Sequence, residues 1–287
     1  MVAAAHDAGF TSASERLVTE WQRQGFLDEP ERVARGRGNG TGARYEWPEN
    51  QKDLFICLLQ QRPGLKQVAG LSQVPVGAWM YWGDEWVPIR QVRRALQTWW
   101  DRAGHLRSWE KTIAQARLVV NTITGPGGSM KSRSKLRDEV ATSMDSGVFD
   151  GAVLEPLVEQ LLKTQPGQLW GPYGFDAVEV VDMMRCFSLA MTDYDETSDG
   201  AFYEVRARHR QMVVQYVRDQ PMLTTHQKFG SWFSDLNFEF LINNSCRDML
   251  LGLGSLKLAA EYGRSLGPVP LQEWKHLPQE LKTLPIK

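Results

Sequence analysis

Arginines interleaved with glycines give this sequence its clearest chemical signal. Between residues 35 and 47 the chain alternates these two residue types and then reaches a pair of aromatic residues. A guanidinium donates several hydrogen bonds to phosphate, and glycine lets a hairpin tip approach a sugar-phosphate backbone closely. The pattern predicts contact with nucleic-acid phosphates or a narrow minor groove, although a flexible Gly/Arg linker would have the same composition. The residues concerned are Arg35, Arg37, Arg44 and Tyr45.

A second segment, GPGGSMKS at Gly125–Ser132, nearly matches the phosphate-binding loop of nucleotide-binding proteins. Met130 stands where that loop needs a glycine before Lys131, so a side chain would obstruct the backbone that cradles phosphate. No acidic strand follows that could hold magnesium. We therefore expect no nucleotide binding and interpret residues 125–135 as an exposed loop or linker. Its cations are candidates for contacts to a phosphate backbone, together with Arg137. They are Lys131, Arg133 and Lys135.

Other residue types that support catalysis or metal binding are scattered along the chain. The five histidines show neither ligand spacing nor a nucleophile motif beside them. The three cysteines lie far apart without a CxxC pair, so we expect reduced core residues and not a zinc module or disulfide framework. An acidic cluster at 193–199 could bind a cation, but a solvated acidic loop explains it more simply. The sequence therefore predicts a protein that is not an enzyme and holds no cofactor and no metal.

Charge is divided unevenly along the 287 residues, although the formal total is only -1. From Arg90 to Arg137 there are eleven Lys or Arg and two acids, whereas from Asp138 to Glu204 there are two bases and fourteen acids. Basic segments bind nucleic acid by releasing counterions from phosphates, whereas the acidic stretch suits a protein partner or a solvated face. The helix expected near 89–102 carries further candidates for phosphate contact, with a solvated basic face as the alternative. These candidates are Arg90, Arg93 and Arg94.

The elements that must position these side chains begin with two short helices. Residues 2–8 favour a helix that Gly9 ends, because glycine adopts the left-handed conformation required there. A second helix is predicted from a capping box of Ser12 and Glu15 to Gly25. Its inward residues at helical spacing are Leu17, Val18 and Trp21. Its polar residues that remain available to an outside partner are Arg16, Thr19, Glu20 and Arg23.

Three features of this region occur together in a known family. The second helix opens with Ser-Glu-Arg at 14–16, it ends in EWQRQGFL, and GRGNGTGARYEWPE follows as a hairpin and the start of a further helix. With these features the segment from Ala3 to Leu59 resembles the MerR-like winged helix-turn-helix family of DNA-binding proteins. The resemblance covers about a fifth of the chain and implies that the second helix enters the major groove, with the hairpin as the wing.

The resemblance also implies roles for individual residues. Arg16 and Arg23 occupy positions where the family carries arginines, so DNA contact is implied for both. Thr19 and Glu20 depart from the usual arginine and tyrosine, which moves more of the expected phosphate contact onto the wing. The implied DNA-binding residues of the helix and wing are Ser14, Arg16, Thr19, Glu20, Arg23, Arg35, Arg37, Arg44 and Tyr45.

We predict a mainly α fold, with an N-terminal winged helix-turn-helix and a small β wing followed by a helical C-terminal domain. Residues 1–105 would form the DNA-binding domain with a tryptophan-rich extension, 106–137 a basic connector, and 138–287 a helical domain that binds a partner or dimerises. Periodicity and Gly/Pro punctuation underlie the helices expected in this last segment. They are Leu154–Lys163, Asp176–Ala190, Glu204–Arg218 and Phe229–Leu251. No stretch approaches the roughly 18 apolar residues of a membrane helix and the N-terminus does not resemble a signal peptide, so we expect a cytoplasmic protein without membrane contact.

The function predicted from these features is sequence-specific binding of double-stranded DNA by a transcriptional regulator. Its C-terminal domain would self-associate or recruit a protein partner. The alternative is a phage-type recombination directionality factor or a DNA-architectural accessory protein that acts through a recombinase. This alternative stays open because MerR-like activators carry a long coiled-coil helix directly after the wing, and the sequence shows none there.

Overall fold

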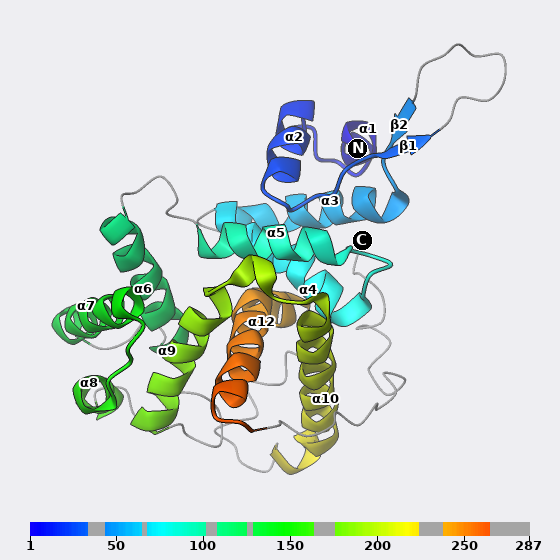
Figure 1. The fold of residues 1–287 in the computed structure, drawn as a ribbon. Helices are drawn as coiled ribbons and strands as arrows, with labels where there is room; N and C mark the ends of the chain where they lie inside the picture. Colours follow the sequence, from blue (N-terminus) through cyan, green and yellow to red (C-terminus); the bar gives the residue numbers. More distant parts are fainter. Residues whose placement is uncertain are drawn as a thin grey trace, which may run out of the picture. The chain divides into compact units, whose positions relative to one another are not determined.

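A computed structural model of the chain describes residues 1–33, 44–64, 68–101, 108–124, 129–163, 176–223 and 238–264. The described chain is mainly helical with one two-stranded sheet, as the sequence predicted (Figure 1). It divides into two compact units, which are treated separately below. Among the described residues, unit 1 comprises those from 1 to 101 together with 238–246, and unit 2 comprises those from 108 to 223 together with 247–264.

Unit 1 begins with two short helices, α1 (Val2–Asp7) and α2 (Glu15–Arg23). The glycine predicted to end the first helix follows it with a φ of +90°, a backbone conformation that suits a residue without Cβ. The capping box of Ser12 and Glu15 was a wrong prediction. The cap of α2 is Ser14, whose hydroxyl accepts a hydrogen bond from the Leu17 amide at 3.3 Å. Both helix ends therefore lie within a few residues of the predicted ones.

A short antiparallel hairpin follows α2 and consists of β1 (Glu31–Val33) and β2 (Arg44–Glu46). The helix α3 (Glu49–Gln61) comes directly after it. Short 3-10 turns, η1 (Arg62–Gly64) and η2 (Val68–Ser72), then lead into the rest of the unit. In Figure 1, α1, α2 and the two strands lie on the same side of unit 1, beside α3.

The remaining helices of unit 1 are α4 (Gln73–Trp82) and α5 (Ile89–Trp100). Apart from Gln73 the helix α4 has apolar and aromatic residues, and it is almost entirely buried, so it forms the centre of the unit. The tryptophans of this region divide into two groups. Trp79, Trp99 and Trp100 are buried, whereas Trp82 and Trp86 are half-buried. The tryptophan-rich segment is thus an integral part of the same body as α2 and the hairpin.

Unit 2 is a set of packed helices in which α6 contacts α7, α7 contacts α8, and α8 contacts α9. Its helices are α6 (Ser108–Thr124), α7 (Met130–Ser146), α8 (Gly151–Lys163), α9 (Ala177–Met191), α10 (Asp199–Leu223) and, from residue 247 onward, α12 (Phe238–Glu261), with the turn η4 (Tyr194–Glu196). The segment expected to be a basic connector, 106–137, contains α6 and the first half of α7. The exposed loop expected at 125–135 was wrong from Met130 onward, where α7 begins.

Helices were correctly predicted in the second half of the chain, with longer bounds than expected. α8 and α10 extend beyond the predicted ranges, and α9 matches its range within one residue. Of the helix expected at Phe229–Leu251, residues 229–237 lie outside the described residues and the rest belongs to α12. Two glycines of α12 allow close packing inside unit 2. A Cβ on Gly252 would overlap Val205 of α10, and one on Gly254 would overlap the backbone of Cys186 of α9.

The described residues can be compared with the predictions about cysteines, metal ligands and membrane helices. Cys57, Cys186 and Cys246 are all buried and form no disulfide. Burial raises the pKa of the Cys57 thiol to about 12. Across the described ranges no group of three or more potential ligands is arranged to hold a metal ion. None of the helices in those ranges combines the length and apolar character needed to cross a membrane.

Candidate nucleic-acid interface

The outward face of α2 presents the polar side chains that the sequence singled out. Arg16, Thr19 and Arg23 are exposed, whereas Val18 and Trp21 on the opposite side are 2% and 1% exposed. The Trp21 indole packs edge-on against Phe55 of α3, with ring centroids 5.4 Å apart, and this contact fixes the rotation of α2 about its axis. The amphipathic pattern of the sequence is therefore confirmed. Ser14 is also exposed, but its hydroxyl is used as the helix cap.

The charges of this face are not all available. Glu20 accepts hydrogen bonds from Arg23 Nη2 at 2.9 and 3.1 Å and from Gln24 Nε2 at 2.7 Å. Arg16, by contrast, makes no hydrogen bond or ion pair within the described part of the chain. The Arg23 side chain is still 75% exposed, and an exposed pair of this spacing is worth only about 0.3–0.5 kcal/mol. A phosphate or base edge could therefore take Arg23 from Glu20 at small energetic cost.

The hairpin has two faces of different chemistry. Arg32 of β1 pairs directly with Tyr45 of β2, and opposite residues in an antiparallel pair project from the same face. Arg32 is exposed, and Tyr45 is 65% exposed. The other face carries Glu31 opposite Glu46, two carboxylates that would repel phosphate, and, by the same register, the pair of Val33 and Arg44. The Arg32 and Tyr45 face is therefore the one suited to a polyanion.

The sequence reasoning missed Arg32 because it looked for arginines among the glycines. The alternation of the strand would have identified it as an exposed residue on the same face as Tyr45. Of the predicted wing residues, Arg35 and Arg37 lie outside the described residues. Arg44 begins β2, and its side chain is likewise outside the description.

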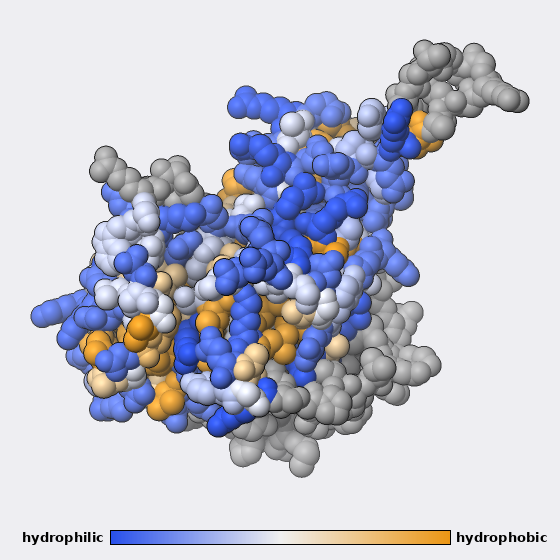
Figure 2. All heavy atoms as spheres, in the orientation of Figure 1, coloured by the Kyte–Doolittle hydropathy of each residue, from blue (hydrophilic) through white to orange (hydrophobic). Residues whose placement is uncertain are grey.

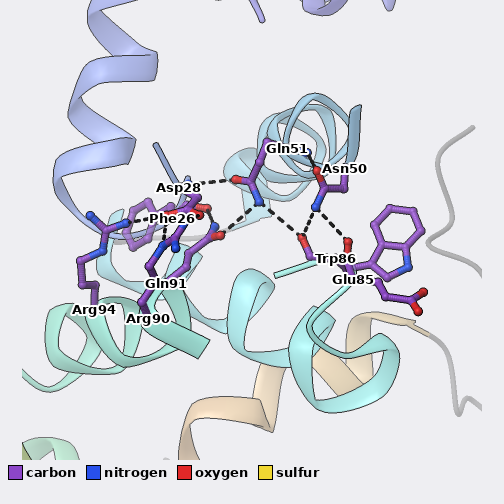
Figure 3. Close-up of polar contacts among 9 residues, drawn as sticks. All are labelled: Phe26, Asp28, Asn50, Gln51, Glu85, Trp86, Arg90, Gln91 and Arg94. Carbon is purple, nitrogen blue, oxygen red and sulfur yellow. Dashed lines mark hydrogen bonds and ion pairs between the residues drawn. The ribbon is translucent and has the colours of Figure 1, made fainter. Parts of the chain in front are cut away.

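A buried polar network holds the segment between α2 and β1 in place (Figure 3). The Asp28 amide donates to Gln51 Oε1 of α3 at 2.8 Å, and the Gln91 amide of α5 donates to the Phe26 carbonyl at 2.7 Å. The two glutamines also bind each other, because Gln51 Nε2 donates to Gln91 Oε1 at 3.1 Å. Asp28, Gln51 and Gln91 are 5%, 2% and 0% exposed, so these hydrogen bonds are shielded from water. The segment that joins α2 to β1 is consequently attached to both α3 and α5.

Two further contacts extend this support. Asn50 Nδ2 donates to the Glu85 and Trp86 carbonyls at 2.9 and 3.1 Å, which ties the start of α3 to the loop before α5. Thr98 of α5 donates to the Gln24 carbonyl at 2.8 Å, just beyond the end of α2. The network thus reaches from Gln24, at the end of α2, to the loop at Glu85 and Trp86 before α5.

Arg90 and Arg94 also take part in this support. Arg90 donates to both Asp28 oxygens, at 2.6 and 3.1 Å, and Arg94 reaches Asp28 Oδ1 at 3.2 Å. Hydrogen bonding to Asp28 raises the pKa of Arg90. The two guanidinium groups neutralise a buried carboxylate, while 71% of the Arg90 side chain and 34% of the Arg94 side chain stay exposed. Their contact with phosphate stays a prediction. Arg93 is half-buried and has a partner of its own.

The remaining predicted phosphate contacts lie in unit 2, on α7. Lys131 and Lys135 are exposed, whereas Arg133 is half-buried and donates to Asn121 of α6 at 2.5 Å. Burial lowers the pKa of Arg133. These three residues therefore belong to a different unit from α2.

Comparison with known proteins finds no matching family, no matching curated protein and no matching solved structure. The functional argument depends on the geometry and chemistry of the chain itself.

Proposed function

We propose that unit 1 is a winged helix-turn-helix that binds double-stranded DNA, with α2 in the major groove and the hairpin as the wing. The observation that carries the proposal is that α2 and the hairpin, both with exposed guanidinium groups, are attached to one buried polar network. A reader of DNA needs this combination, because base contacts have discriminating power only when the helix is held in register by the rest of the protein.

The side chains on α2 suit base edges as well as phosphates. Arg16 and Arg23 can each make paired hydrogen bonds to guanine, and Glu20 can accept from the amino group of cytosine. The methyl group of Thr19 is suited to the methyl group of thymine, since the Thr19 hydroxyl is already bound to the Glu15 carbonyl at 3.0 Å. We propose that the protein is a sequence-specific, non-catalytic regulator of transcription that acts in the cytoplasm.

The hydropathy of the surface supports a polar ligand at this place. In Figure 2 the visible face over α2 and α3 is mostly hydrophilic, with a small hydrophobic area beside the strands. Interfaces with DNA are more polar and more positively charged than interfaces between proteins. The unit 2 helices would then serve self-association or a protein partner.

The test begins with selection of random duplexes on the full chain, followed by fluorescence anisotropy on a selected site. Replacing Arg16 and Arg23 with Ala should weaken binding to the selected site by about 1–3 kcal/mol per lost base contact, which is about 5- to 150-fold. Binding to unrelated duplexes should fall much less. Affinity for the selected site equal to that of the unmodified protein would contradict the proposal.

A matched control lies in the same unit. Lys52 pairs with Glu49 at a spacing of three residues, as Arg23 does with Glu20, and Arg62 is an exposed arginine just after α3. Replacing Lys52 and Arg62 with Ala removes the same charge from unit 1 without altering α2. The control variant should keep the preference for the selected site, so a loss of preference in both variants would indicate a general charge effect.

A second candidate function is an accessory protein that holds a recombinase. It is favoured by the 13-residue length of α3 and by the short helices that follow it in the same unit, where a MerR-like activator carries a long helix. A stable complex with a recombinase, without any effect on transcription, would support this function. A discrete footprint next to a promoter would support the regulator.

A further inference from the structure

We propose that unit 2 carries a second surface for nucleic-acid phosphates, formed by the α6–α7 hairpin. We define the basic hairpin as the described residues between Lys111 and Arg137. This part of the sequence contains six Lys or Arg and no Asp or Glu. The inference rests on the proposed function in one respect, which is that duplex DNA is the polyanion expected to meet the protein.

Three cations of the basic hairpin are free to bind an outside anion. Arg117 of α6 and Lys131 and Lys135 of α7 are exposed, and none of them makes an ion pair or hydrogen bond within the described part of the chain. Lys131 and Lys135 are one helical turn apart, on the side of α7 away from the buried Leu136 and Val140. Phosphate binding by these side chains would break no internal contact. In Figure 2 hydrophilic side chains project from the visible face of α7.

The two helices of the basic hairpin, α6 and α7, are held together independently of these three cations. The Arg133 guanidinium joins α7 to α6 by its hydrogen bond to Asn121, and Arg137 donates to Ser134 Oγ at 2.9 Å and Asp138 Oδ1 at 2.6 Å. The basic residues therefore divide into structural ones and unpaired ones. This division allows the unpaired ones to be replaced without separating the helices.

The order of charges along α7 opposes the stability of the helix. Lys131 is in the first turn, which has no acidic residue, and Asp145 is in the last turn, which has no basic residue. The helix macrodipole favours the reverse arrangement, with acids at the N-terminus and bases at the C-terminus. Helix stability therefore does not explain the placement of Lys131, and attraction of an anion does.

The rest of the described sequence of unit 2 limits where a polyanion can bind. Carboxylates resume at Asp138 and dominate as far as Glu204, so those helices repel phosphate. Charges more than about 8–10 Å apart are screened at physiological salt, so the hairpin keeps its local attraction. An anionic membrane would be attracted by the same charges, but in the described part of α6 and α7 the exposed large apolar side chains are just Trp109, at the start of α6, and Met130, at the start of α7. DNA is therefore the favoured occupant.

The test measures anisotropy of a labelled random-sequence duplex with the full chain over a series of NaCl concentrations. The logarithm of the binding constant falls against the logarithm of salt with a slope of about 0.9 per phosphate contact. Replacing Arg117, Lys131 and Lys135 with Ala should therefore reduce the slope by nearly three. The unfolding midpoint should stay the same or rise, because Lys131 opposes the macrodipole.

The control removes three cations from elsewhere in unit 2, by replacing Lys163, Arg206 and Arg264 with Ala, and it should leave the slope unchanged. A slope in the hairpin variant equal to that of the unmodified protein would overturn the inference. Binding to phosphatidylserine vesicles is measured in parallel. The inference is also overturned if the hairpin variant loses binding to these vesicles but keeps its binding to DNA.

The variant of α2 in unit 1 separates this inference from the proposed function. If only the proposed function fails, replacing Arg16 and Arg23 changes nothing while the hairpin variant still lowers the slope. If only the inference fails, replacing Arg16 and Arg23 weakens binding to the selected site, while the slope of the hairpin variant equals that of the unmodified protein.

Discussion

Gly25 is the point at which the support of α2 is most sensitive to a single methyl group. Its φ is +76°, and a Cβ there would overlap the Arg94 side chain and lie 2.9 Å from the backbone nitrogen of Ala95 in α5. An alanine forced into the left-handed conformation costs about 1–2 kcal/mol. Overpacking against a helix backbone that cannot rotate away adds about 1–3 kcal/mol. We therefore predict that Gly25→Ala lowers the free energy of unfolding by about 2–5 kcal/mol.

Two other glycines serve as controls. Alanine at either position would be strained by the positive φ, but its Cβ would overlap no neighbouring atom. Gly9 in unit 1 has a φ of +90° and Gly147 in unit 2 a φ of +72°, and a Cβ on either would meet nothing within 4 Å. Replacement of either by Ala should cost only about 1–2 kcal/mol. The difference between Gly25→Ala and Gly9→Ala measures the close approach of the α2 end to α5.

The assay is urea unfolding followed by tryptophan fluorescence, with hydrogen exchange of the α5 amides as a local readout. Gly25→Ala should lower the urea midpoint more than Gly9→Ala and should speed exchange in α5, because that helix must move to admit the methyl group. DNA affinity should also fall, because the displaced segment carries both α2 and β1. Equal midpoints and equal exchange in the two variants would refute the argument that α5 fixes α2.

Three further predictions concern single residues. Glu20→Gln should tighten binding to duplexes unrelated to the selected site, because it loosens the hold on Arg23 and removes a carboxylate from the face of α2; weaker binding to these duplexes in anisotropy would contradict this. Burial lowers the pKa of His209 from 6.5, so the unfolded chain binds a proton more readily than the folded one. Thermal stability should therefore fall as the pH drops below about 6.5, and His209→Gln should flatten this fall; an unchanged pH profile would exclude the residue as its cause. Gly254→Ala should destabilise unit 2 by about 1–3 kcal/mol in urea unfolding because its methyl group overlaps the backbone of Cys186, and a loss below about 1 kcal/mol would show that α9 and α12 separate easily.

The buried network around Asp28 also bears on how specificity would be kept. Half-satisfied buried polar groups are costly, so Asp28, Gln51 and Gln91 hold the end of α2 in one arrangement. A purely apolar contact between α3 and α5 would allow small rotations of α2. Hydrogen bonds with defined directions do not, and this property suits a helix that must present side chains to base edges.

The sequence by itself determined several local features of this protein. Periodicity fixed the buried side of α2, glycine fixed the end of α1, and charge blocks separated a basic middle from an acidic second half. These features depend on residues close together in the chain, whose preferences for helix, turn or solvent hold before any tertiary contact forms. The placement of Arg16, Thr19 and Arg23 on the outer face of a helix followed for the same reason.

Only the tertiary structure decided which charged residues have partners in distant segments of the chain. Arg90 resembles Arg16 in the sequence, as a basic residue on an amphipathic helix, yet it binds Asp28, which lies 62 residues away along the chain. Arg32 gained its significance from pairing with Tyr45 across a hairpin. The partner of a charged side chain depends on contacts between distant segments, and these arise from packing of the whole unit, which no local pattern encodes.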